Sequence, residues 1–137
     1  MRSEEIEIRT GGDEAVRDIT RECERFLGDD GGAPDGLLHV FVPHATAGLA
    51  VIETGAGSDE DLLRRLRDLL PPDDRWSHRH GSPGHGRDHV LPALISPSLS
   101  IPVLGGRMAL GTWQSVCLVD TNGDNPTRRV RLSLLAG

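Results

Sequence analysis

The chain has 137 residues with 15 basic and 21 acidic side chains, which gives a formal net charge of −6. Every basic residue is arginine, so a Schiff-base lysine and the lysine of a phosphate-binding P-loop are both excluded. The negative charge argues against a general nucleic-acid surface. The length predicts one domain, residues 1–137, and the 3% aromatic content requires a core of Leu, Val, Ile and Ala.

The N-terminus and the cysteines both argue against an exported protein. Residues 1–9 are charged and lack the apolar core of a signal peptide, and no apolar run is long enough to span a membrane. Cys23 and Cys117 match no metal or redox motif and lie in apolar patterns, so we expect both to be reduced and buried. We therefore expect a soluble, cytoplasmic protein with neither a membrane nor a nucleic acid as partner.

The first 27 residues predict a strand followed by a helix. Ile6 and Ile8 alternate with charged residues, which is typical of a half-buried strand. Apolar residues then recur at helical spacing over residues 16–27. Asp13 and Glu14 precede them, where the positive end of a helix dipole favours carboxylates.

Two strands and a second helix are expected next. Residues 37–42 and 48–53 are apolar, and we expect them to form a hairpin with His44 and Thr46 at its tip. Residues 58–70 carry acidic side chains in their first turn and a stripe of leucines, which predicts a helix that the following prolines end.

The second half of the chain consists mainly of predicted strands. A short helix is expected over residues 89–95 and a strand over 99–103, whose proline indicates a sheet edge. Residues 112–119 can all be extended, which would place Trp113 and Gln114 on opposite faces of one strand.

The end of the chain predicts a turn and a last strand. Residues 122–126 are typical of a hairpin turn, and residues 129–135 alternate apolar and polar side chains. The order of these elements predicts an α+β fold: a sandwich of mainly antiparallel β-sheets with two or three helices.

Histidine is the clearest chemical signal in the sequence. Residues 73–87 show no apolar pattern but contain three of the six histidines, and His89 follows two residues later. Imidazole is the commonest metal ligand and transfers protons near neutral pH. We expect no His-x-x-x-His pair on a helix, and there is no Cys pair. His80 and His85 are expected to be bystanders because Gly and Pro surround them, and the alternative for the whole segment is a solvated loop.

Charged residues elsewhere suit two supporting roles. Glu53, Asp59 and Asp61 can orient a histidine, although Asp59 also suits the start of a helix. Arg107 and Arg129 can bind phosphate in a bidentate manner, and pairing with the acidic excess on the surface is the alternative.

Several motifs together resemble the YjbQ family, also called secondary thiamine-phosphate synthases, over the last two thirds of the chain. Gly-Thr-Trp-Gln at this distance from a His-x-Thr motif is a specific combination, whereas each motif alone is weak. Ala45 departs from the family, which usually has Thr or Ser there. The matching segments are His44-Ala45-Thr46 with Glu53, Asp61-Leu62, Trp76-Ser77-His78 with His89, Ser98 to Val103, Gly106 to Gln114, and Arg128-Arg129.

The resemblance implies a function and an assembly. It implies a transferase that joins a pyrimidine methyl diphosphate to a thiazole phosphate and releases diphosphate. It also implies a homotrimer with the site near or between subunits. The alternatives are a metal-dependent hydrolase that uses the same histidines, or a non-catalytic protein that binds a metal or a small phosphorylated molecule.

The resemblance also implies which residues form the site. A divalent metal ion, Mg or Zn, is expected at His44, His78 and His89. Arg107 or Arg129 is expected to steady a phosphate group. The expected catalytic residues are His44, Thr46, Glu53, His89, Trp113 and Gln114.

Overall fold

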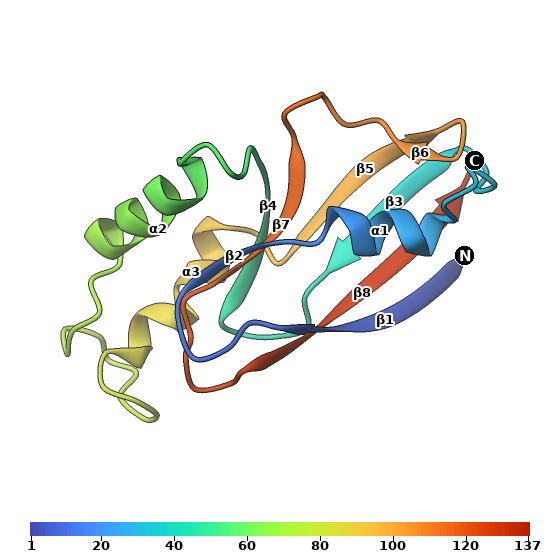
Figure 1. The fold of residues 1–137 in the computed structure, drawn as a ribbon. Coiled ribbons are helices and arrows are strands. Elements are labelled where there is room, and N and C mark those ends of the chain that lie inside the picture. Colours follow the sequence, from blue (N-terminus) through green and yellow to red (C-terminus); the bar gives the residue numbers. More distant parts are fainter.

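Two antiparallel sheets pack face to face in the computed structural model, which describes residues 1–137 (Figure 1). The larger sheet has five strands in the order β1-β8-β3-β5-β6, and the smaller has three in the order β2-β7-β4. The predicted α+β sandwich is confirmed. The strands are β1 (Arg2–Arg9), β2 (Ala15–Asp18), β3 (Gly36–Phe41), β4 (Ala47–Ile52), β5 (Ser98–Leu104), β6 (Arg107–Met108), β7 (Ser115–Asp120) and β8 (Thr127–Ala136).

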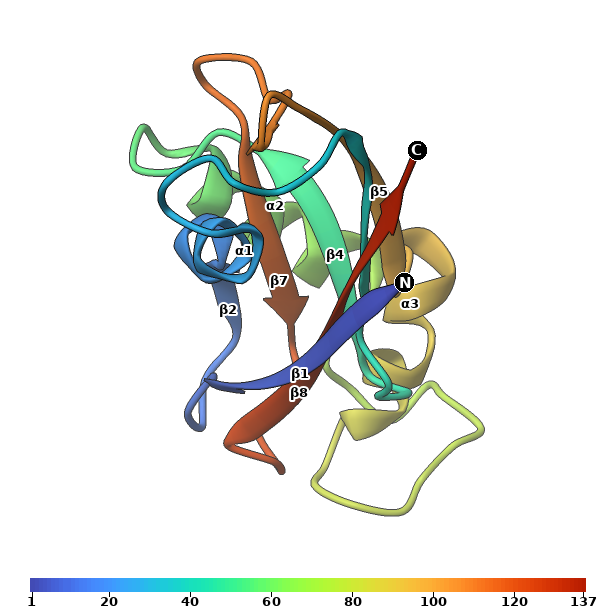
Figure 2. The ribbon, with the colours of Figure 1, turned by 90° about the vertical axis from the view of Figure 1, so that its right-hand side faces the viewer.

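The main core fills the space between the sheets. Val130, Leu132 and Leu134 of β8 point inward and are at most 3% exposed, as their alternation with polar residues predicts. Helix α1 (Thr20–Leu27) lies beside the two sheets and contributes Phe26 to the same core (Figure 2). The core is therefore almost entirely aliphatic, as the composition requires.

A layer of helices covers the outer face of the smaller sheet (Figure 1). It comprises α2 (Ser58–Leu69), the 3₁₀ helix η1 (His85–His89) and α3 (Leu91–Leu94). A second apolar cluster joins Leu66, Leu70 and Leu91 of this layer to Val119 of β7. Strand β7 is consequently buried on both faces, which explains its continuous apolar sequence. No helix in the structure has both the length and the apolarity needed to cross a membrane.

The helix predicted over residues 16–27 begins later than its periodicity indicates. Residues 15–18 form β2, which pairs with β7, and α1 starts at Thr20. The Asp18 carboxylate accepts a hydrogen bond from the Thr20 backbone N–H at 2.9 Å, which forms a local turn between β2 and the helix. Pairing with a strand far along the chain overrides the local helical pattern here.

The two predicted hairpins are also wrong, because each joins strands of different sheets. Strand β3 pairs with β5 and β8, whereas β4 pairs with β7, so His44 and Thr46 lie in a crossover. Residues 121–126 likewise connect β7 of the smaller sheet to β8 of the larger. Turn chemistry marks where the chain reverses, but the partner of each strand depends on the whole sandwich.

Strand β7 is shorter than predicted at its start. It begins at Ser115, and Trp113 and Gln114 lie in a turn before it. The sheet edge predicted at Pro102 is wrong, because β5 lies between β3 and β6. The Pro102 carbonyl accepts a hydrogen bond from the Ala109 N–H at 2.8 Å, just beyond the paired residues of β6. Strand β6 pairs only with Val103 and Leu104 of β5, so a proline without an N–H is tolerated there.

Both cysteines are free and buried, as expected. Burial, together with nearby carboxylates, raises the pKa of the Cys23 thiol to about 12 and that of Cys117 to about 12. Neither thiol is therefore a nucleophile near neutral pH.

A buried ion pair joins the two sheets at one end of the sandwich. Arg128 continues the inward row of β8 and Asp120 is the last residue of β7; both side chains are 1% exposed. The guanidinium Nε donates to the Asp120 carboxylate at 2.5 Å, and an Nη also contacts the Asn122 carbonyl at 3.5 Å. Burial raises the pKa of Asp120, and the bonds from Arg128 and from the Asn122 N–H oppose that rise.

Removing Arg128 should destabilise the protein strongly. Arg128→Ala leaves Asp120 buried without its cation, so we expect the free energy of unfolding to fall by about 3–5 kcal/mol. Chemical denaturation at fixed protein concentration measures the change. The control is Arg131→Ala, which breaks an exposed pair with Glu5 and should cost about 0.2–1 kcal/mol. Equal losses in the two variants would contradict a special role for the buried pair.

Candidate functional site

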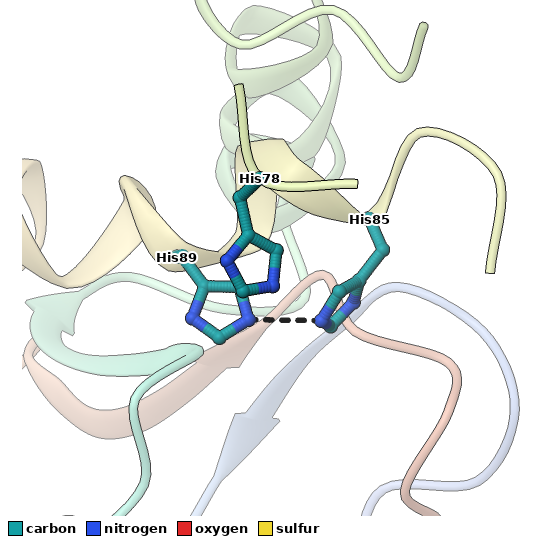
Figure 3. A group of neighbouring side chains, drawn as sticks. All are labelled: His78, His85 and His89. Carbon is teal, nitrogen blue, oxygen red and sulfur yellow. Dashed lines mark hydrogen bonds between the residues drawn. The ribbon is translucent and has the colours of Figure 1, made fainter. Parts of the chain in front are cut away.

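Three histidines converge beside the end of the smaller sheet (Figure 3). One ring nitrogen each from His78, His85 and His89 lies within 4.8 Å of the other two. The Nε2 atoms of His85 and His89 are 2.9 Å apart, and the ring centroids of His78 and His89 are 3.8 Å apart. Two of the rings come from η1, and the third comes from the loop that precedes it.

The spacing of two of these histidines corrects the sequence interpretation. His85 and His89 are a His-x-x-x-His pair, and they lie on the short helix η1. His85 was expected to lie apart from the site because Gly and Pro surround it, yet it is buried within the cluster. His44 takes no part in the cluster. His80, the other expected bystander, is exposed, with its ring centroid 3.8 Å from that of His78.

A glycine allows the loop to approach η1. At Gly86, an added Cβ would collide with the carbonyl oxygen of His78 and the Cβ of Trp76. The Trp76 indole N–H donates to the Pro71 carbonyl at 2.9 Å and fixes the loop to the end of α2. Only a residue without a side chain at position 86 lets the His78 ring reach the other two.

Carboxylates lie directly behind the cluster. An Asp88 oxygen is 3.1 Å from His85 Nδ1, and its other oxygen accepts a hydrogen bond from the Thr121 hydroxyl at 2.6 Å. An Asp124 oxygen is 3.4 Å from the same His85 nitrogen and accepts the Ser82 N–H at 3.1 Å. His85 therefore has acidic residues on the side of its ring away from the cluster, as metal-ligating histidines usually do.

Helix η1 is held in place by a buried arginine. Arg87 pairs with Glu14, which also accepts a hydrogen bond from Arg67 of α2 at 2.8 Å. A second Arg87 nitrogen donates to the Leu70 carbonyl at 3.2 Å. These bonds tie η1 to α2 and to the residues before β2, so the backbone that carries two of the three histidines is fixed on several sides.

The cluster fits a divalent metal ion. His78 Nε2 is buried and has no hydrogen-bond partner, so a lone pair or an N–H of this ring is left for a ligand. Burial and then the neighbouring histidines lower the pKa of both His78 and His89, which favours the neutral rings that bind metals. Imidazole donors favour Zn over Mg, because Mg prefers oxygen ligands.

Thr46 lies on the same side of the fold as the cluster. Its hydroxyl accepts a hydrogen bond from the side-chain N–H of Asn122 at 3.2 Å, and the side-chain oxygen Oδ1 of Asn122 accepts one from the Asp124 backbone N–H at 2.9 Å. Asp124 in turn approaches His85. His44 instead accepts the backbone N–H of Arg129 at its Nε2, at 2.9 Å, and the Arg129 guanidinium pairs with Glu5 on the surface.

The other predicted site residues gather at the opposite end of the smaller sheet. Ala47 of β4 pairs with Asp120 near the histidines, whereas Ile52 pairs with Ser115 at the far end. Five residue steps of about 3.3 Å separate these two pairs, so the ends lie roughly 17 Å apart. The residues at the far end are Glu53, which is half-buried, Trp113, which is 72% exposed, and Gln114, which lines a groove of about 290 Å³ together with Arg107.

The fold and the site define a class of small α+β sandwich proteins with a histidine cluster at one end of the smaller sheet. The family model for UPF0047 proteins, described as YjbQ-like, matches residues 4–137. This chain belongs to that family. A UPF0047 protein of Mycobacterium tuberculosis H37Rv is 66% identical over 103 residues, which cover 75% of this chain and 77% of the relative. A UPF0047 protein of Archaeoglobus fulgidus is 31% identical over 131 residues, which cover 96% of this chain and 99% of the relative.

Solved structures share the whole fold. A hypothetical protein from Aeropyrum pernix K1 is 36% identical and superimposes with a TM-score of 0.87 over 100% of both chains. A protein from Sulfolobus solfataricus P2, described as YbjQ-like and of unknown function, is 25% identical, with a TM-score of 0.89 over 99% of this chain and 97% of that one. These similarities establish the family and the fold.

Sequence reasoning missed several residues around the cluster, and only some of them left a signal. The spacing His85-x-x-Asp88-His89 was a usable signal, because one helical turn brings all three together. The sequence gives no such signal for Thr121, Asn122 and Asp124, because they lie in a stretch that has the composition of an ordinary polar turn.

His44 should make the stability of the protein depend on pH. Burial lowers its pKa, as do Arg128 and Arg129, while Asp120 and Glu5 oppose the shift. In the unfolded chain His44 is protonated as the pH falls below about 6.5, whereas in the folded protein it stays neutral at that pH. The free energy of unfolding therefore decreases as the pH drops through that value. His44→Gln keeps an acceptor for the Arg129 N–H and should flatten this fall between pH 7.5 and 5. Urea denaturation of both proteins across that range measures the difference, and identical profiles would contradict the assignment.

Proposed function

We propose that this protein is a metal-assisted transferase that forms thiamine phosphate from a pyrimidine methyl diphosphate and a thiazole phosphate, with release of diphosphate. The convergence of His78, His85 and His89, with the buried Asp88 carboxylate behind His85, carries the proposal. The resemblance of the sequence motifs to secondary thiamine-phosphate synthases supports the choice of reaction. The ligand partner is thus a small phosphorylated molecule.

The residues around the cluster suit the departure of diphosphate. A divalent ion held by the three histidines, Zn in preference to Mg, would supply a Lewis acid for the oxygens of the leaving group. Arg79 lines the same depression of about 380 Å³ as His78 and His85, and can add a second positive charge. The Thr46 hydroxyl accepts from Asn122, so its own proton is left to donate to a phosphate oxygen.

The second group of residues suits the two rings of the substrates. Trp113 can stack on an aromatic ring, and Glu53 and Gln114 can bind the amine and nitrogens of a pyrimidine. Arg107 can bind the phosphate of the thiazole. Because β4 and β7 hold these residues roughly 17 Å from the histidines, a complete site requires the far end of a second copy. We therefore propose that each site lies between two subunits of the homotrimer that the family resemblance implies.

A metal-dependent hydrolase is the second candidate. Three protein ligands with an open fourth position are the usual arrangement of catalytic zinc sites, and three histidines are one such donor set. A non-catalytic binding protein would use the same donors. The three candidates differ in what the protein does to a phosphorylated substrate, which a single set of assays can distinguish.

Metal binding and turnover should depend on the cluster. We expect wild-type protein to bind Zn²⁺ or Co²⁺ and to form thiamine phosphate, with activity lost in a chelator. His85→Ala should lower kcat/KM by about 100-fold or more, since even the supporting residues of metal sites typically contribute 10–100-fold. The control is His39→Ala, which removes a half-buried ring that is bonded to Ser100 on the larger sheet.

Each other outcome of these assays selects a different function. Release of phosphate or diphosphate without thiamine phosphate would favour the hydrolase. Tight binding of metal or substrate without turnover would favour the binding protein. Thiamine phosphate formation that survives both the chelator and His85→Ala would overturn the histidine-centred site.

Mixing two inactive variants should restore activity if each site is shared. His89→Ala damages one half of a site and Trp113→Ala the other, so each homotrimer should be inactive. In an equal mixture, a site works when its histidines come from one variant and its tryptophan from the other, which predicts about one quarter of wild-type activity. Co-expression and assay of the mixed trimers measure the recovery. A mixture of His89→Ala with the double variant is the control, and no recovery in the first mixture would contradict the shared site.

A further inference from the structure

We infer that Asp88 is a positioning residue that fixes the tautomer and orientation of His85, so that its Nε2 lone pair points into the histidine cluster. This inference rests on the proposed metal site. It goes further because it assigns a role to a buried carboxylate that does not face the cluster itself. Asp88 is 3% exposed and lies between His85, Thr121 and Arg87.

The direction of the hydrogen bond follows from the chemistry of the two partners. An ionised carboxylate only accepts, so the contact of 3.1 Å requires the proton of His85 to be on Nδ1. The Nε2 atom then carries a lone pair, and it lies 2.9 Å from His89 Nε2. Two ring nitrogens this close must share a proton or a cation, so the Asp88 contact makes His85 a ready acceptor for either.

Asp88 is itself held in one orientation. Its second oxygen accepts the Thr121 hydroxyl at 2.6 Å and lies 3.6 Å from Arg87 Nε. Arg87 is buried and anchored by Glu14 and the Leu70 carbonyl. Both oxygens are therefore engaged and the carboxylate cannot rotate away from His85. A rigid partner of this kind fixes the orientation of an imidazole ring and the nitrogen that carries its proton.

The other carboxylate near His85 is less suited to this role. Asp124 is 37% exposed, lies 3.4 Å from His85 Nδ1, and is already engaged by the Ser82 N–H. It is a natural control, because Asp124→Asn removes the same charge at nearly the same distance. Its substitution tests whether any nearby negative charge suffices, or whether the buried and fixed one is needed.

The experiment measures metal affinity and the tautomer of His85 in the full-length protein. We expect Asp88→Asn to weaken Zn²⁺ binding by about 10–100-fold, and Asp124→Asn to weaken it clearly less, because Asp124 is more exposed and farther from His85 Nδ1. In metal-free wild type, ¹⁵N NMR of the histidine rings should show His85 protonated at Nδ1. In Asp88→Asn the tautomer of His85 that is protonated at Nδ1 should no longer be the major form. A purely structural role would lower the melting temperature without moving the tautomer.

A second variant covers a failure of Asp88→Asn to fold. Thr121→Val removes only the hydroxyl that holds the far oxygen of Asp88, and should weaken Zn²⁺ binding with the fold intact. The inference would be overturned if Asp88→Asn changed neither the Zn²⁺ affinity nor the tautomer of His85. If Asp88→Asn does not fold, the same result in Thr121→Val would overturn it. If wild type binds no metal, the proposed function fails, while the tautomer measurement still decides the role of Asp88.

Discussion

The ion pair between Asp120 and Arg128 is the constraint on which the site end of the molecule depends. It joins the last residue of β7 to the start of β8, and so ties the smaller sheet to the larger where apolar packing ends. An inward-facing arginine at 1% exposure is acceptable only with a partner of opposite charge. The pair therefore fixes how the chain leaves one sheet and enters the other.

Three polar side chains in the connection between β7 and β8 form hydrogen bonds with three other segments of the chain. Thr121 holds Asp88 behind the histidines, Asn122 holds Thr46 of the crossover between β3 and β4, and Asp124 holds the loop through Ser82. A turn of six residues thus links all the segments around the histidine cluster. The rigidity of this network matters because a metal site or a catalytic group needs its donors held in one geometry.

The smaller sheet separates the two groups of residues that the proposed reaction needs. A strand cannot bend to bring Trp113 to the histidines, since its hydrogen bonds and its buried faces on both sides fix it. The exposed tryptophan and the groove at Arg107 and Gln114 are therefore free for contacts outside the chain itself. The proposed sharing of the site between copies would bring the residues at the two ends of this strand pair together.

The sequence by itself determined the elements whose pattern is local. The alternation in β8 and β1, the leucine stripe of α2 and the buried cysteines all follow from side chains a few residues apart. The tertiary structure alone decided which strands share a sheet, that residues 15–18 form a strand, and that His78, but not His44, reaches the pair His85 and His89. The physical reason is that these outcomes depend on partners distant in the chain, such as β7 for β2 and the Gly86 contact for His78, and no local periodicity records them.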